Sequence, residues 1–189
     1  MTNPDIRDIF LDSPIIAAIK DDDLLHKAVK SDCDVVFILY GTICNIAKIV
    51  DEIKENNKIA IVHVDLIQGL GNREVSVDFI KEQTRADGII STKQNLVRRA
   101  KELNMIAGER TFAVDSMALA TINSHINILK PDFLEIMPGL VTKIISQIST
   151  ITRVPVVAGG LISDKADILE ALNAGACAIS TTRSELWEL

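Results

Sequence analysis

The chain has 189 residues, 48% of them hydrophobic, and a formal net charge of −6 at pH 7. This length and apolar content suit one domain with a sizeable core, so we expect residues 1–189 to form a single domain. The negative charge argues against a surface wholly devoted to nucleic acid, because phosphate neutralisation needs Lys and Arg. A local basic patch remains compatible with it.

No targeting or membrane segment is evident. The first fifteen residues contain Asp5, Arg7, Asp8 and Asp12 and no apolar core, unlike a secretory signal. No run approaches the roughly 18 apolar residues of a membrane span. The three cysteines lack CxxC spacing and the three histidines are scattered, so the sequence predicts reduced thiols and no metal site. We therefore expect a cytoplasmic protein with no membrane partner.

One unit, a short apolar run followed by a polar turn and an amphipathic stretch, recurs about eight times. Apolar residues from Ile43 to Ile53 and from Leu140 to Ile151 recur at helical spacing, which predicts helices there. The nearly continuous apolar runs between such stretches are typical of parallel strands buried on both faces. In chain order, the expected strands are Ile15–Ile19, Val35–Leu39, Ile59–Val64, Gly88–Ile90, Thr111–Val114, Phe133–Ile136, Pro155–Ala158 and Ala176–Ile179.

Alternating strands and helices predict an α/β fold with a parallel sheet, and eight units close a (β/α)₈ barrel. We therefore predict a small TIM-like barrel. An open flavodoxin-like sheet is the alternative, because the chain is slightly shorter than is usual for such barrels. Five or six strands would, however, leave two or three apolar runs unplaced. In a closed barrel, the functional site is expected at the rim formed by the C-terminal ends of the strands.

The strongest chemical signal follows the last two expected strands. Two glycines after a strand let backbone N–H groups approach an anion, and Ser/Thr hydroxyls at the next helix start add donors. Many such barrels bind phosphate between these two loops, so the sequence predicts a phosphate site. The alternative is a tight turn followed by a helix cap. The residues concerned are Gly159, Gly160, Leu161, Ser180, Thr181 and Thr182.

Polar residues also follow or end other expected strands at this rim. An unpaired buried carboxylate is costly, so we expect Glu135, inside an apolar strand, to meet a cation or ligand hydroxyls. For each of these residues the alternative is a solvated loop residue, a helix cap or a satisfied interior group. The positions are Lys20, Asp65, Lys93, Asp115, Ser116 and Glu135.

A basic cluster, formed by Arg98, Arg99 and Lys101, lies on the expected fourth helix. Such a cluster is typical of a solvated helix face and is less often a nucleic-acid contact. No RNP-like aromatic signature, KH loop or helix-turn-helix pattern accompanies it.

Segments along essentially the whole chain resemble the bacterial glycerol uptake operon antiterminator regulatory proteins. The more specific of them are Asp87–Lys93 and Lys130–Gly139, whereas the Gly-Gly segment is shared with many phosphate-binding barrels. The segments that carry the resemblance are Pro14–Lys20, Val36–Gly41, His63–Leu70, Asp87–Lys93, Lys130–Gly139 and Val156–Leu161.

The resemblance implies a TIM-barrel-like regulator that responds to glycerol 3-phosphate and acts on the leader mRNA of glycerol-utilisation genes, allowing transcription past a terminator. It implies no catalytic residue and no cofactor. A phosphorylated polyol needs donors for its phosphate and carboxylates plus a Lys for its hydroxyls. On this interpretation the hydroxyls are bound by Asp65, Lys93, Glu135 and Lys20, and RNA is contacted by Arg98, Arg99 and Lys101.

Two other interpretations remain open. An isomerase or aldolase acting on a phosphorylated metabolite could use Lys20 or Lys93 as a Schiff base, or Asp65 and Glu135 as base and acid. The second is a metabolite-binding module that acts through a protein partner; it would bind the same ligand but have no affinity for RNA. Fold alone does not decide among these functions.

Overall fold

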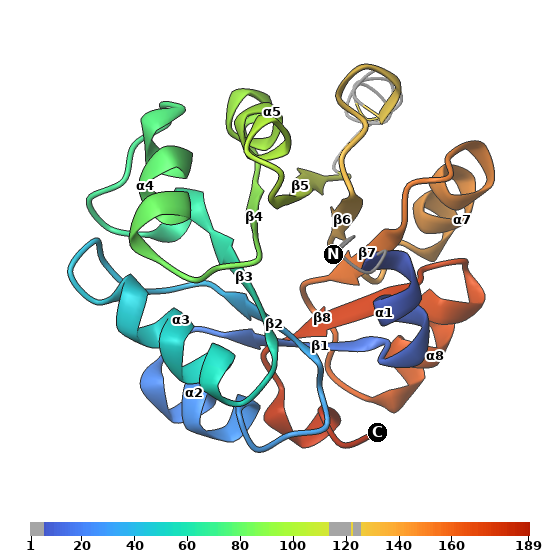
Figure 1. Ribbon diagram of the computed structural model, residues 1–189. Helices are drawn as coiled ribbons and strands as arrows, with labels where there is room; N and C mark the ends of the chain where they lie inside the picture. The colour runs from blue at the N-terminus through green and yellow to red at the C-terminus, as the bar shows by residue number, and fades with distance from the viewer. Residues whose placement is uncertain (1–5, 114–121, 123–125) are drawn as a thin grey trace.

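The computed structural model describes residues 6–113, 122 and 126–189 of the chain. Its parallel strands follow one another around a closed barrel in chain order, and the last strand pairs with the first (Figure 1). The strands are β1 (Ile15–Ile19), β2 (Val35–Ile38), β3 (Ile59–His63), β4 (Gly88–Ser91), β5 (Ile106–Phe112), β6 (Phe133–Met137), β7 (Val156–Gly159) and β8 (Ala178–Thr181).

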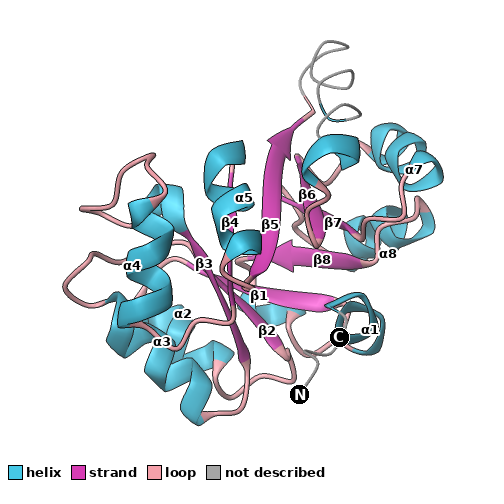
Figure 2. Ribbon diagram, turned by 45° about the horizontal axis from the view of Figure 1, so that its top comes forward, coloured by secondary structure: helices cyan, strands magenta, loops and turns pink. Residues whose placement is uncertain are grey.

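Helices alternate with the strands and pack around the outside of the barrel (Figure 2). None of the described helices is long and apolar enough to cross a membrane. The described helices are α1 (Ile6–Asp12), α2 (Asp22–Ala28), α3 (Ile46–Glu55), α4 (Val75–Gln83), α5 (Gln94–Glu102), α7 (Thr142–Ile151) and α8 (Lys165–Asn173), with 3-10 turns η1 (Val64–Leu66) and η2 (Ser184–Leu186).

Closure of the sheet confirms the predicted TIM barrel over the open alternative. Ile15 of β1 is the register partner of Ile179 of β8, and the backbone N–H of Ile179 donates to Pro14 O at 2.8 Å. Trp187, 2% exposed, packs behind this seam, and its indole N–H donates to Thr181 O at 3.0 Å. The chain ends are therefore joined by main-chain hydrogen bonds and covered by a buried aromatic ring.

The fifth strand corrects the sequence prediction. We expected it at Thr111–Val114, but it begins at Ile106 and ends at Phe112. Glu109 and Arg110 interrupt the apolar run, so a search for continuous apolar residues does not find this strand. A charged strand is tolerated here because Arg110 pairs with a carboxylate of the neighbouring strand, Glu135 of β6.

Inside the barrel, three phenylalanines form the lower core. Phe133 lies between Phe10 and Phe37, with both ring-centroid separations at 5.5 Å. Phe10 comes from α1, which we did not expect to contribute apolar core, and it is fully buried together with Ile6 at 5% exposure. Gly108 makes room for Phe133, since a Cβ at this glycine would overlap the ring. Helix α1 thus closes the N-terminal end of the barrel.

A second apolar layer lies between the strands and the surrounding helices. Helix α3 illustrates it: Ile46, Ile49, Val50 and Ile53 are all buried, which confirms the predicted stripe. Ile43, which we placed in the same stripe, lies before the helix and is 45% exposed.

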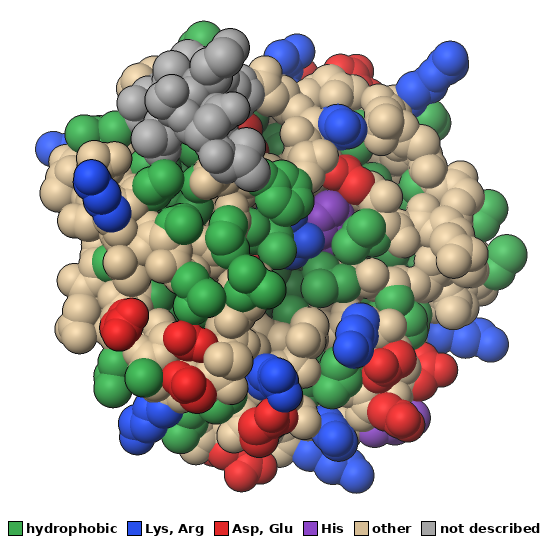
Figure 3. Space-filling view, turned by 180° about the vertical axis from the view of Figure 1, so that it is seen from behind, with side chains coloured by type: hydrophobic (Ala, Val, Ile, Leu, Met, Phe, Trp, Pro, Cys, Tyr) green, Lys and Arg blue, Asp and Glu red, His purple; other side chains and the backbone are tan. Residues whose placement is uncertain are grey.

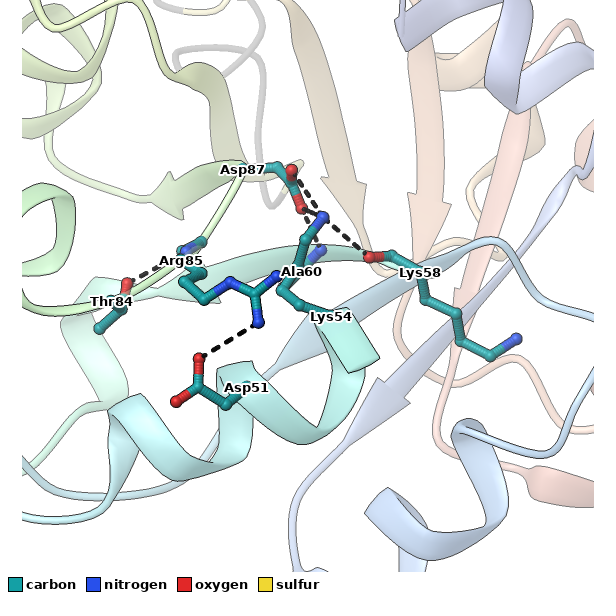
Figure 4. Close-up of polar contacts among 8 residues, drawn as sticks. Asp51, Lys54, Lys58, Ala60, Thr84, Arg85 and Asp87 are labelled. Atoms are coloured by element: carbon teal, nitrogen blue, oxygen red, sulfur yellow. Dashed lines mark hydrogen bonds and ion pairs between the residues drawn. The ribbon is translucent and has the colours of Figure 1, made fainter. Parts of the chain in front are cut away.

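At the N-terminal ends of the strands, an acidic residue fixes two neighbouring units to each other (Figure 4). The Lys54 Nζ donates to both carboxylate oxygens of Asp87, at 2.8 and 2.6 Å, and to Lys58 O at 3.1 Å. Asp87 also accepts the backbone N–H of Ala60 at 2.8 Å. The last turn of α3 is thereby tied to the starts of β3 and β4.

The same arrangement recurs further along the chain. Lys101, in the last turn of α5, donates to Asp132 at 3.0 Å, and Asp132 accepts the backbone N–H of Ala107 at 2.8 Å. We name these two sets the Asp87 clamp and the Asp132 clamp. Both lie at the end of the barrel opposite the expected site, where side chains commonly serve stability.

We predict that Asp87→Ala lowers the free energy of unfolding by about 2 kcal/mol, because it leaves a partly buried Lys54 and a backbone N–H without their acceptor. Urea unfolding measures the change. The control is Asp51→Ala, since Asp51 pairs with Arg85 at 3.9 Å in an exposed contact that is expected to contribute less than about 0.5 kcal/mol. Equal losses of unfolding free energy in the two variants would show that the Asp87 clamp stabilises the fold no more than an exposed ion pair does.

Candidate functional site

A small pocket of about 100 Å³ opens at the C-terminal end of the barrel. This volume lies well below the roughly 300–1,000 Å³ of pockets for drug-sized ligands, so it suits a small molecule. Five residues proposed from the sequence for phosphate binding line it together with Glu135. These lining residues are Gly160, Leu161, Ser180, Thr181 and Thr182.

The loop after β7 has a left-handed backbone at two successive residues, Gly160 at φ +74° and Leu161 at φ +63°. Glycine suits the first of these positions, because L side chains rarely adopt this conformation and an added Cβ would lie 2.6 Å from Met137 Cε, which would have to move. The Gly160 carbonyl accepts the N–H of Gly139 at 3.0 Å, which ties the loop to the one after β6. The left-handed pair turns the chain sharply at the edge of the pocket.

The segment after β8 supplies hydroxyls at the opposite edge. Thr181 Oγ1 donates to Ile162 O at 3.3 Å and accepts the N–H of Arg183 at 3.2 Å, so this hydroxyl braces the two loops against each other. Thr182 is exposed beside it. The hydroxyl of Ser180 is buried and donates to Glu135 Oε1. Only part of the predicted hydroxyl set is therefore open to solvent.

Glu135 and Arg110 form a buried ion pair on the floor of this pocket. The Arg110 Nε donates to Glu135 Oε2, and their side chains are 8% and 1% exposed. Arg110 is the cation that the buried carboxylate required. Gly159 leaves space for this carboxylate, because a Cβ there would overlap Glu135 Oε1 and lie 2.5 Å from Ser180 Oγ. The geometry gives Gly159 a packing role in the floor.

His63, at the end of β3, is 2% exposed, and its Nδ1 has no hydrogen-bond partner. Burial, reinforced by the positive charge of Arg110, lowers the pKa of His63 to about 4, although Asp65 acts in the opposite direction. The imidazole is therefore neutral at pH 7. Figure 3 shows a histidine and basic and acidic side chains near the centre of one face of the molecule, among hydrophobic side chains.

Asp65, one of the predicted hydroxyl-binding residues, is engaged by its own neighbours. Its carboxylate accepts the Ser91 hydroxyl and both the N–H and the hydroxyl of Thr92, the last two at 2.8 and 2.7 Å. Burial alone would raise the pKa of Asp65, but these hydrogen bonds outweigh it and lower the pKa. Asp65 thus holds the loop between β4 and α5 in place.

The other predicted hydroxyl-binding residues are not brought to the pocket. Lys20 follows β1 and Lys93 precedes α5, both exposed and both outside the pocket lining. Asp115 and Ser116 lie outside the described residues. Of the predicted hydroxyl-binding set, Glu135 alone lines this pocket.

The basic cluster is largely paired with acidic residues. Arg99 donates to Asp78 at 2.8 Å and to Glu102 at 2.9 Å, and Lys101 belongs to the Asp132 clamp. Arg98 is exposed and makes no ion pair with the described part of the chain. The three cations therefore do not form an open basic surface.

Arg110 is the residue that our sequence reasoning missed. The misplaced fifth strand excluded it, although a two-residue alternation from Gly108 through Arg110 to Phe112 would have placed the guanidinium inside the barrel. The sequence did draw attention to its acidic partner, Glu135, as a carboxylate inside an apolar strand. Among the described residues, no group of three or more His, Cys, Asp or Glu side chains could hold a metal ion.

Comparison with known proteins identifies relatives across nearly the whole chain. Residues 15–187 match the family described as glycerol-3-phosphate responsive antiterminator. An uncharacterized Escherichia coli (strain K12) protein, YgcP, is 41% identical over 177 residues, covering 94% of this chain and 93% of its own length.

Solved structures agree with this match. A glycerol uptake operon antiterminator regulatory protein from Listeria monocytogenes has a TM-score of 0.90 and 29% identity, covering 94% of this chain and 96% of that one. A glycerol uptake operon antiterminator-related protein from Thermotoga maritima has a TM-score of 0.84 and 33% identity, covering 94% and 99%. An aldolase at 13% identity and a TM-score of 0.73 shares the fold alone.

We predict that protonation of the buried His63 lowers the free energy of unfolding in mild acid. The unfolded chain binds a proton at His63 near pH 6.5, whereas the folded chain resists it until about pH 4. The free energy of unfolding is therefore at its full value above pH 6.5, where His63 is neutral in both states. It falls as the pH falls towards 4, by up to roughly 1.4 kcal/mol per pH unit.

Urea unfolding between pH 7 and pH 4.5 measures this dependence. His63→Asn is expected to have a shallower slope than the wild type, and the control His26→Asn, at an exposed position, is expected to keep it. If His63→Asn keeps the wild-type slope, the interpretation of a neutral buried imidazole is wrong.

Proposed function

Because this chain belongs to the glycerol-3-phosphate responsive antiterminator family, we propose that it binds glycerol 3-phosphate and leader mRNA and thereby promotes transcription antitermination of glycerol-utilisation genes. The observation that carries the proposal is the family match over residues 15–187, which covers the barrel from β1 to its last turn. The small pocket at the rim is chemically suited to such a ligand, and we assign the ligand to it.

The phosphate in this proposal lies between the loop at Gly160 and Leu161 and the segment at Thr181 and Thr182. In support, the backbone N–H groups of Leu161 and Thr182 donate to no described backbone acceptor. Free N–H groups and hydroxyls on two facing loops are donors that a phosphate accepts. The phosphate is thus held where the last two strands of the barrel, β7 and β8, end.

We further propose that the protein acts as a regulator without enzyme activity. A Schiff-base lysine has to be activated, as by desolvation in an apolar pocket, but none of the described strand residues is a lysine. Lys20 and Lys93 are both exposed outside the pocket lining. The candidate acid and base, Asp65 and Glu135, are engaged by Ser91, Thr92, Arg110 and Ser180.

RNA contact is assigned to the α5 face that carries Arg98, Arg99 and Lys101. Arg98 is able to reach a phosphate directly, whereas the other two would have to share their carboxylate partners with it. With an overall charge of −6, binding relies on few phosphate contacts. A weak dependence of affinity on salt is the expected signature.

The function is tested by titrating leader RNA at several salt concentrations, with and without glycerol 3-phosphate. We expect the ligand to strengthen binding. Arg98→Gln is expected to lower the slope of log affinity against log salt by roughly 0.7–0.9, the loss of one phosphate contact. The control is Lys48→Gln, an exposed cation on α3. Ligand-independent RNA affinity in the wild type would refute the proposal. An unchanged slope in Arg98→Gln would show that RNA does not contact the α5 face.

We also predict that Gly160→Ala weakens glycerol 3-phosphate binding by about tenfold or more, because its Cβ meets Met137 at the pocket edge and its backbone is left-handed. Calorimetry measures the affinity. Gly71→Ala is the matched control, since no heavy atom lies within 4 Å of an added Cβ there. Equal affinities in the two variants would place the phosphate elsewhere.

A further inference from the structure

Only one edge of the Arg110 guanidinium is used within the described part of the protein. Its Nε donates to Glu135, and no other hydrogen bond or ion pair of this side chain is present among the described residues. A guanidinium has five N–H donors in a planar fork, and four of them lie on the two terminal nitrogens. The side chain nevertheless has only 8% of its surface exposed.

These terminal N–H groups are open to the pocket, because Arg110 lines it and they are not among the described buried polar atoms that lack a partner. Arg110 lines the pocket at the rim, together with Gly160 and Thr182. The fork of an arginine matches two oxygens of a phosphate or carboxylate and binds them as a pair. The pocket therefore combines the terminal N–H groups of a guanidinium with the hydroxyls and N–H groups of the two loops.

The donors of the pocket, and not a net positive charge, suit it to an anion. Arg110 is the only basic residue among the described residues that line the pocket, and Glu135 is the only acidic one. Both Glu135 oxygens are occupied, Oε2 by Arg110 and Oε1 by Ser180. The nearby His63 is neutral at pH 7. An entering anion thus meets the donors of Arg110 and the two loops, and each oxygen of the carboxylate already accepts a hydrogen bond.

We propose that Arg110 binds the phosphate group of the ligand through its terminal nitrogens, and that Glu135 and Ser180 are positioning residues that orient the guanidinium. The inference rests on the proposed function, since it assigns a specificity-determining residue to the same ligand site. It also gives Glu135 a role different from the hydroxyl binding expected from the sequence.

The positioning follows from the packing of β5, β6, β7 and β8. Arg110 and Glu135 are register partners on β5 and β6, so the ion pair lies directly across the sheet. Ser180 reaches Glu135 from β8, and Gly159 of β7 leaves the space for this contact. Glu135 is held at both oxygens, and it in turn restrains the guanidinium at a fixed angle.

Calorimetric titration with glycerol 3-phosphate and, separately, with inorganic phosphate tests the proposal. Arg110→Gln alone leaves Glu135 buried and unpaired and threatens folding, so the main variant is Arg110→Gln/Glu135→Gln, which removes both charges. The matched control is Arg85→Gln/Asp51→Asn, which removes an exposed ion pair far from the pocket. Circular dichroism and thermal melting establish that each variant is folded.

We expect the main variant to lose about tenfold or more in affinity for both ligands, and the control to bind like the wild type. Glu135→Gln alone, which leaves the guanidinium unpaired and is interpreted only where the variant is folded, should give a smaller loss than the main variant for both ligands. If the folded main variant binds both ligands as the wild type does, Arg110 does not bind the ligand. If it loses glycerol 3-phosphate and keeps inorganic phosphate, Arg110 binds hydroxyls and the assignment to phosphate is wrong.

These outcomes are distinguishable from failure of the proposed function. If the wild-type protein binds glycerol 3-phosphate through Arg110 but shows no ligand-dependent RNA binding, the role of Arg110 is supported and the proposed regulatory function is contradicted. Ligand-dependent RNA binding that persists in the main variant at wild-type ligand concentrations retains the regulator and contradicts the inference. A wild-type protein that binds neither glycerol 3-phosphate nor inorganic phosphate contradicts both.

Discussion

The width of an eight-stranded barrel limits what its interior can hold, and the other features of this protein depend on that limit. Such a barrel is just wide enough for side chains to fill it. Here the lower part is filled by Phe133 between two further phenylalanine rings, with Gly108 opposite to make room. Above this layer, the space is taken by an ion pair, and the pocket is what remains at the top. The small size of the pocket is thus a consequence of the fold.

The ion pair is an unusual choice for stability alone. Two apolar side chains of similar volume often stabilise a core at least as well, because they carry no desolvation cost. In this barrel the pair has a geometric effect: it sets a guanidinium between β5 and β6 and ties a buried carboxylate to β8. At the other end of the barrel, the acidic residues of the Asp87 and Asp132 clamps join helices to strand starts. The ion pair between Arg110 and Glu135, by contrast, joins strands to one another.

The sequence predicts those parts of the structure that depend on apolar patterning. Eight recurring units predict the closed barrel, and adjacency of the last two strands brings Gly160 and Thr181 to one pocket. Patterning failed where a charge is buried: Arg110 interrupts an apolar run, and its compensation by Glu135 is visible only in three dimensions. Nor does patterning show the contacts of Asp65, since a position at the end of a strand does not tell whether a side chain turns to a ligand or to its own loop.

The pairing of β1 with β8 has a consequence for folding. Every other strand pair joins neighbours along the chain, so those contacts close short loops, whereas this seam joins the two ends and closes the longest loop of all. We expect it to form last, with Trp187 covering it. The proposed ligand pocket is lined by Ala18 of β1 and Ser180 of β8, and it is complete only when the seam has formed. Any ligand that binds only the completed pocket therefore raises the free energy of unfolding of the whole barrel, by an amount that grows with the logarithm of its concentration.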